Sequence, residues 1–112
     1  MSTDRELLEL AAKAAGYDYA KHGGYIVVDG IPGNWNPLVV DRDALRLAVK
    51  LKIAFFPPEN DEGDFAVAAI AEGVLSDDGD AWIQEWVKGG DKLAATRRAI
   101  VRAAAEIGRS VP

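Results

Sequence analysis

The sequence has no cysteine and a single histidine, His22, and these two scarcities remove several kinds of chemistry. Without cysteine the chain has no disulfides, no thiolate zinc site and no cysteine nucleophile. One histidine cannot build a metal cluster, and it leaves serine and threonine with little choice of a neighbouring base. We therefore expect no metal, no cofactor and no catalytic residues, and the lack of cysteine suits a reducing cytosol.

Long apolar runs are also missing. No stretch approaches the ~18 apolar residues of a membrane-spanning helix, and the first 20 residues mix Asp4 and Glu6 with helix-spaced apolar residues, unlike a signal peptide. The 112 residues, 49% of them hydrophobic, are enough for one continuous core. We expect a single domain over residues 1–112 that is soluble and intracellular.

Basic residues are absent from 59–85, where nine acidic residues occur, while the rest of the chain holds all 13 basic residues and nine acidic ones. This distribution predicts an electrically polarised molecule and disfavours direct nucleic-acid binding by the surface as a whole. Clustered carboxylates can instead imitate a phosphate backbone and steer a basic partner. The candidate acidic binding surface consists of Glu59, Asp61, Glu62, Asp64, Asp77, Asp78 and Asp80.

Three segments are typical of helices. Thr3 and Glu6 have the spacing of a capping box, and Gly16 supplies a stop after an apolar stripe. Asp91 is placed to cap the last helix and Gly108 to end it. Between them, a helix that begins with Asp41 as its N-cap has its apolar face at Ala44, Leu47, Ala48 and Leu51.

The remaining segments are typical of strands. Residues 25–29 are rich in β-branched side chains and should end at Gly30, Pro32 and Gly33, and residues 52–56 are stopped by Pro57 and Pro58. Residues 64–75 and 81–88 are expected to form a hairpin. A two-residue turn would put Glu72 opposite Glu85, so a three-residue loop over 77–79 is favoured, with the pairs Val74–Trp82, Glu72–Gln84 and Ile70–Trp86.

These elements give the order α-β-α-β-β-β-α, without regular βαβ repetition. The order predicts an α+β domain in which a small, mostly antiparallel sheet of about four strands is covered by three helices. The many alanines of the first and last helices should let them approach the sheet or each other closely.

Trp35 lies in "WNPL" (35–38), on the link between a strand and a helix. Aromatic residues at element ends usually close a core, so we favour a Trp35 that is mostly buried against Leu38, Leu47 or the adjoining strand. The alternative is a ligand-stacking Trp35 in a small enzyme or a nucleotide- or ligand-binding protein.

Basic stripes mark two helices, and "SDDGD" (76–80) suggests a cation loop. A basic stripe is usually the solvated face of an amphipathic helix, with a phosphate-binding or DNA-binding surface as the weaker alternative. Aspartate and glycine are what a hairpin turn needs, so we favour a plain turn over a metal loop. The stripe residues are Arg42, Arg46 and Lys50 in one helix, and Arg98 and Arg102 in the other, flanked by Arg97 and Arg109.

Three segments resemble small phage and prophage proteins of unknown function, related to the NinX-like group of tailed phages. They are "WNPL" (35–38), "DALRLAVKL" (43–51) and "AATRRAIVRAAAEIG" (94–108). Members of the group often carry Asp-Asp-Gly-Asp before the "ALRLA" helix, whereas this chain has Val-Asp-Arg-Asp at 40–43. The resemblance brings no catalytic residues and implies a phage or prophage product that acts in the bacterial cytoplasm.

The leading functional hypothesis is a non-enzymatic phage or prophage accessory protein that binds a host bacterial protein or nucleoprotein complex. The acidic surface favours a nucleic-acid-targeting host defence as the partner, as in anti-CRISPR proteins and other counter-defence proteins. A homo-oligomer is compatible with the sequence.

Overall fold

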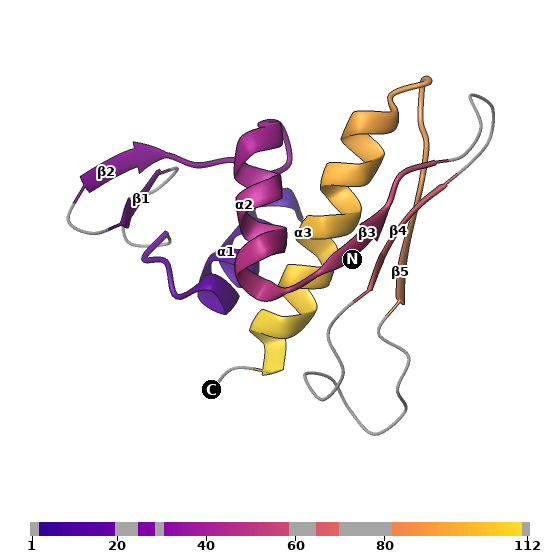
Figure 1. Cartoon of the computed structure of the whole chain (residues 1–112). Coiled ribbons are helices and arrows are strands. Elements are labelled where there is room, and N and C mark those ends of the chain that lie inside the picture. Colours follow the sequence, from indigo (N-terminus) through magenta and orange to yellow (C-terminus); the bar gives the residue numbers. More distant parts are fainter. Residues whose placement is uncertain (1–2, 20–24, 29–30, 59–64, 70–81, 111–112) are drawn as a thin grey trace.

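In a computed structural model of the chain, residues 3–19, 25–28, 31–58, 65–69 and 82–110 are described (Figure 1). They form three helices, α1 (Asp4–Ala15), α2 (Asp41–Leu51) and α3 (Lys92–Ser110). The strands are β1 (Tyr25–Val28), β2 (Ile31–Asn34), β3 (Ala54–Phe56), β4 (Phe65–Ala69) and β5 (Trp82–Trp86). The α+β class and the order of the expected elements are confirmed, with one strand, β2, added to them.

α3 is the centre of the fold. It packs against α1 and α2 on one side and against the antiparallel sheet β3-β4-β5 on the other (Figure 1). Small side chains allow this close packing, since Ala99, Ala103, Ala104 and Ala105 of α3 are fully buried. The approach that the alanines predicted is therefore confirmed for α1 and α3.

Gly108 lies inside α3 rather than at its end, so the prediction that it stops the helix is wrong. A Cβ atom at this position would lie 2.0 Å from the carbonyl oxygen of Leu10 in α1. The glycine is therefore needed where two helix backbones approach each other, and α3 continues to Ser110.

The other helix ends follow from their capping residues. Thr3 caps α1 by accepting from the backbone N–H of Glu6, Gly16 ends α1 in the left-handed conformation, and Asp91 accepts from the N–H of Ala94 at the start of α3. These three predictions are confirmed. Asp41 is not an N-cap, because Val40 holds that position without a side-chain hydrogen bond.

The strand predicted over 52–56 begins later, at Ala54, because Lys52 belongs to the end of α2. Its backbone is left-handed (φ 57°), and its N–H donates to the carbonyls of Ala48 and Val49. Two last-turn carbonyls of the helix are thereby satisfied by the residue that was expected to open the strand.

The expected strand over 25–29 ends at Val28, and Pro32 and Gly33 do not terminate a strand but belong to β2. In the β1–β2 hairpin, Val27 lies opposite Pro32 and Ile26 opposite Gly33. Each strand of a two-stranded hairpin has one unpaired edge, so a proline without an N–H is accommodated there.

The predicted register of the last hairpin is wrong. In place of Val74–Trp82, Glu72–Gln84 and Ile70–Trp86, the structure pairs Ala69 with Trp82, Val67 with Gln84 and Phe65 with Trp86. The expected loop over 77–79 lies outside the described residues.

The observed register leaves a small side chain opposite Glu85. It places the fully buried Ala66 opposite Glu85 on the face that carries α3. Avoiding one like-charge pair contributes only about 0.2–1 kcal/mol, which is too little to fix a register by itself. The hairpin signal alone therefore could not decide the register.

Among the described residues, none of the helices combines the length and the apolar character needed to cross a membrane.

Candidate functional site

The link that carries Trp35 is held by hydrogen bonds on both sides. The backbone carbonyl of Asn36 accepts from the N–H groups of Val39 and Val40, and its side-chain oxygen accepts from the N–H of Leu38 (3.1 Å). The N–H of Asn36 donates to Oδ2 of Asp43 in the first turn of α2 (2.9 Å). Asparagine before proline thus closes the turn, and Asp43 fixes it against the helix.

Trp35 is 5% exposed, which confirms the prediction that it is buried. Its ring meets Tyr17 edge-on at a centroid distance of 5.8 Å and Tyr19 at 5.4 Å. These partners come from the segment after α1, where the sequence pattern predicted neither a helix nor a strand. Edge-to-face aromatic pairs contribute about 0.5–1.5 kcal/mol beyond area burial, so Trp35 ties the β1–β2 hairpin to α1 and α2.

A pocket of about 380 Å³ lies beside this aromatic cluster. Its lining includes Arg42, Asp43 and Arg46 of α2, together with Trp35 and Tyr17. Its remaining lining residues are Ile26, Pro32, Gly33 and Asn34. The structure thus brings three of the sequence-predicted residues, Trp35, Arg42 and Arg46, to one place.

Lys50 completes the basic row of α2 and contacts Tyr17 of the pocket lining. Its Nζ atom lies 4.7 Å from the ring centroid of Tyr17, which is a cation–π contact. Arg42 and Arg46 are exposed and make no hydrogen bond or ion pair within the described residues. Two unpaired guanidinium groups one helical turn apart therefore stand at the pocket rim.

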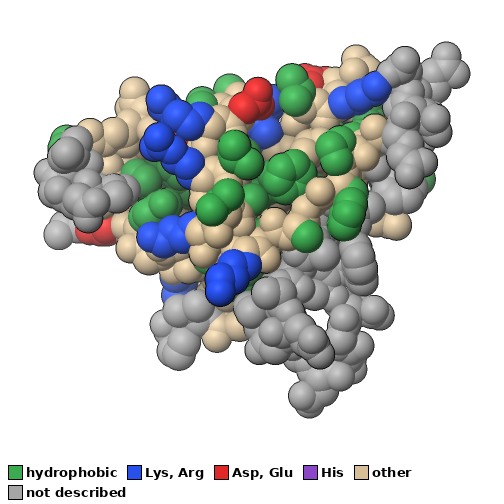
Figure 2. Space-filling model, in the orientation of Figure 1, with side chains coloured by type: hydrophobic (Ala, Val, Ile, Leu, Met, Phe, Trp, Pro, Cys, Tyr) green, Lys and Arg blue, Asp and Glu red, His purple; other side chains and the backbone are tan. Residues whose placement is uncertain are grey.

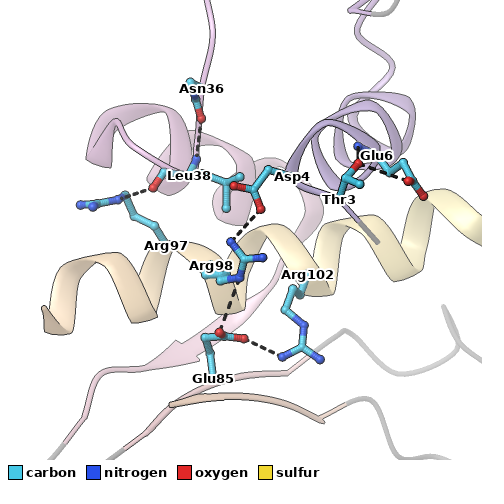
Figure 3. Close-up of polar contacts among 9 residues, drawn as sticks. All are labelled: Thr3, Asp4, Glu6, Asn36, Leu38, Glu85, Arg97, Arg98 and Arg102. Atoms are coloured by element: carbon cyan, nitrogen blue, oxygen red, sulfur yellow. Dashed lines mark hydrogen bonds and ion pairs between the residues drawn. The ribbon is translucent and has the colours of Figure 1, made fainter. Parts of the chain in front are cut away.

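The arginines of α3 have a different environment, because they are bound to carboxylates (Figure 3). Arg102 donates to Oε2 of Glu85 (2.6 Å) and to the carbonyl of Gln84, while Arg98 lies between Asp4 (3.0 Å) and Glu85 (3.5 Å). Their charges are largely neutralised within the fold. Arg98 and Arg102 thus connect α3 to β5 and α1, which weighs against a DNA-binding stripe.

Arg97 is also engaged within the fold. Its Nε donates to the carbonyl of Leu38 (2.9 Å) and its guanidinium pairs with Asp41 (2.6 Å). Arg97 thereby joins the turn before α2 to the start of α3 (Figure 3).

Glu85 is a residue whose role the sequence reasoning missed, although it is 8% exposed and receives two arginines. The available signal was alternation, since Ile83 and Glu85 share one face of β5 and Val87, just after the strand, continues the same spacing. A carboxylate between two partly buried apolar residues indicates a buried position that requires cationic partners.

A second hollow, of about 260 Å³, lies between α2, β3 and the start of α3, and we call it the α2–α3 groove. Leu45, Phe55, Leu93 and Ile100 are among its lining residues. Leu45 and Leu93 are 53% and 61% exposed, and the nearby Val49 of α2 is 71% exposed. Figure 2 shows hydrophobic side chains gathered in the middle of this face, with Lys and Arg side chains beside them.

The acidic candidates, Glu59, Asp61, Glu62, Asp64, Asp77, Asp78 and Asp80, lie outside the described residues. Within the described ranges, no group of three or more histidine, aspartate and glutamate side chains is arranged to hold a metal ion.

Comparison of the chain with models of protein families, with curated proteins and with solved structures finds no match.

Proposed function

We propose that the protein is a non-enzymatic accessory protein of phage or prophage origin that binds a host bacterial protein at the α2–α3 groove. The observation that carries this proposal is the exposed apolar surface of Leu45, Val49 and Leu93 around a groove with apolar walls. A contiguous exposed apolar patch often marks a protein-binding site, whereas apolar side chains scattered singly over a surface are normal. The phage context rests on the resemblance of the "WNPL" and helical segments.

The rim of the groove indicates the chemistry of the occupant. Asp41 and Arg97 on the rim neutralise each other (2.6 Å), whereas Arg42 has no partner within the described part of the chain. The rim therefore has one uncompensated positive charge. The complementary partner is an amphipathic helical segment whose apolar side chains enter the groove and whose flanking acidic side chain meets Arg42.

A host defence that targets nucleic acids remains our proposal for the partner's identity. It rests on the acidic stretch of the sequence, whereas the docking surface rests on the described residues. The two parts of the proposal can therefore be tested separately.

A photo-crosslinking amino acid at Val49 tests the surface in bacterial cells, with the same amino acid at exposed Arg5 of α1 as a matched control. We expect a discrete cross-linked species from position 49 and not from position 5. Changing both Leu45 and Leu93 to Ser should abolish it, because these side chains form the apolar walls. Equal cross-linking at both positions, or cross-linking that survives the double substitution, would contradict the proposal.

Synthetic peptides test the occupant's chemistry. A leucine- and glutamate-containing amphipathic helix should bind the protein, and the same helix with lysine for glutamate should bind at least about tenfold more weakly. Arg42→Gln should reduce this difference. Equal binding of the two peptides would refute the assigned role of Arg42.

A further inference from the structure

The pocket beside Trp35 is separate from the α2–α3 groove, although both border α2. Trp35, Tyr17 and Arg46 line only the pocket, whereas Leu45, Leu93 and Ile100 line only the groove. Arg42 lines both. Substitutions can therefore address each site without touching the other.

The pocket has the size and the polarity of a small-molecule site. Its volume of about 380 Å³ falls within the range of about 300–1,000 Å³ that is usual for ligand pockets. Apolar and aromatic residues contribute to its lining, and of these Tyr17 and Pro32 have the most exposed surface. Such a lining suits the ring-bearing part of a ligand rather than a bare ion.

The lining of the pocket also carries positive charge. Arg42 and Arg46 have no internal partner within the described residues, and each guanidinium can offer two parallel N–H groups to a phosphate. Lys50 does not line the pocket, but its Nζ atom lies 4.7 Å from the ring centroid of Tyr17, which does. This arrangement differs from that of Arg98 and Arg102, whose donors are occupied by Glu85.

Asp43 supplies an acceptor in the lining of the pocket. Its Oδ2 accepts from the N–H of Asn36 (2.9 Å), and no buried side-chain oxygen of the described residues lacks a hydrogen-bond partner. The other oxygen, Oδ1, has no hydrogen-bond partner there and therefore keeps contact with solvent. It can accept from a hydroxyl or amino group of a ligand in the pocket.

We propose that this pocket binds a small phosphate monoester with a ring-bearing body, of the nucleoside monophosphate class. The phosphate meets Arg42 and Arg46, the ring packs along Tyr17 and Pro32, and a ligand hydroxyl donates to Asp43. The proposal goes beyond host-protein binding and does not depend on it, because Arg46 and the aromatic residues of the pocket are not part of the groove.

Calorimetric titration with adenosine 5′-monophosphate, adenosine and inorganic phosphate tests the proposal on the full chain. The monophosphate should bind at least about tenfold more tightly than adenosine, since charge-assisted contacts are lost without the phosphate. It should also bind more tightly than inorganic phosphate, which lacks the ring. Equal affinity for the monophosphate and inorganic phosphate, or no binding of the monophosphate at millimolar concentration, would overturn the proposal.

Arg46→Gln tests whether the monophosphate binds in this pocket. Leu45→Ser is the matched control, since both side chains are exposed on α2. We expect Arg46→Gln to weaken monophosphate binding about tenfold or more, because a charge-assisted contact is removed. Leu45→Ser should leave monophosphate binding unchanged while it weakens binding in the groove. Equal monophosphate affinity of wild-type protein and Arg46→Gln, at unchanged unfolding temperature, would place the ligand elsewhere and refute the pocket.

Discussion

At the scale of single residues, Glu85 has the most consequential environment of any carboxylate described in the fold. It is almost fully buried, and its two oxygens meet Arg98 and Arg102 of α3. The arginines remain partly exposed, with side-chain exposures of 35% and 40%, so water recovers part of their solvation when Glu85 is changed. Removing the carboxylate of Glu85 should therefore cost less folding free energy than removing one partner of a fully buried ion pair.

Glu85→Gln should lower the free energy of unfolding by about 1–2 kcal/mol, because the amide keeps one acceptor oxygen for an arginine and places an NH2 donor against the other. The control is Glu106→Gln in α3, which breaks an exposed ion pair with Arg109 of the same helix. It should change the free energy of unfolding by less than about 0.5 kcal/mol. Urea unfolding of both variants checks the difference. Equal effects would show that the Glu85 network contributes no more than a surface pair.

At the scale of elements, the contact of α1 with α3 depends on the absence of a side chain at Gly108. Glycine to alanine inside a helix normally stabilises it by about 0.5–1 kcal/mol. Here the added Cβ would lie 2.0 Å from a backbone oxygen of Leu10, and a backbone cannot move aside as a flexible side chain can.

Gly108→Ala should therefore destabilise the protein by about 1–3 kcal/mol, the usual effect of overpacking. Gly33→Ala is the matched control, since a Cβ there would meet no atom within 4 Å and the backbone is not left-handed. Thermal unfolding of the two variants measures the difference. A stabilised Gly108→Ala variant would mean that the two helices lie farther apart.

Local signals predicted the helices better than the strands, for a physical reason. Caps such as Thr3 and Asp91 act within one turn of the helix, so the sequence discloses them without knowledge of the tertiary fold. Gly108 has the same local appearance as a helix stop, and only its contact with Leu10 distinguishes the two roles. The predicted hairpin register was wrong for a similar reason. Contacts with α3 and its arginines decide which residues of β4 face inward, and these contacts are not visible in the local sequence.

The candidate site was predictable in part. The buried Trp35 and the basic row of α2 followed from turn chemistry and helical spacing. Its neighbours Tyr17 and Tyr19 did not, because no periodicity connects residues after α1 with a turn before α2. The unpaired state of Arg42 and Arg46, and the paired state of Arg98 and Arg102, likewise depend on which elements become neighbours.

At the scale of the whole molecule, the fold has a central body around α3 and a peripheral β1–β2 hairpin (Figure 1). The strands of the hairpin pair only with each other within the described chain, and Trp35 at its end is buried among Tyr17 and Tyr19. In contrast, the buried alanines of α3 are enclosed by α1, α2 and the sheet. Local opening should therefore begin at the hairpin.

Amide hydrogen exchange should show this order, with the paired amides of β1 and β2 exchanging at least about tenfold faster than those in the middle of α3. Trp35→Ala should accelerate exchange in the hairpin more than in α3, because it removes the aromatic attachment. Equal protection of hairpin and α3 amides would show that the chain opens as one cooperative unit.

Arg42 of α2 lines both proposed sites, and this shared position has a thermodynamic consequence. An acidic side chain in the groove and a phosphate in the pocket would compete for the same guanidinium, which carries a single charge. Each ligand would then lower the affinity for the other, and by the same factor, because coupling between two binding equilibria is reciprocal. A nucleotide pool in the cell could in this way regulate how tightly the protein holds its partner, without any change of fold.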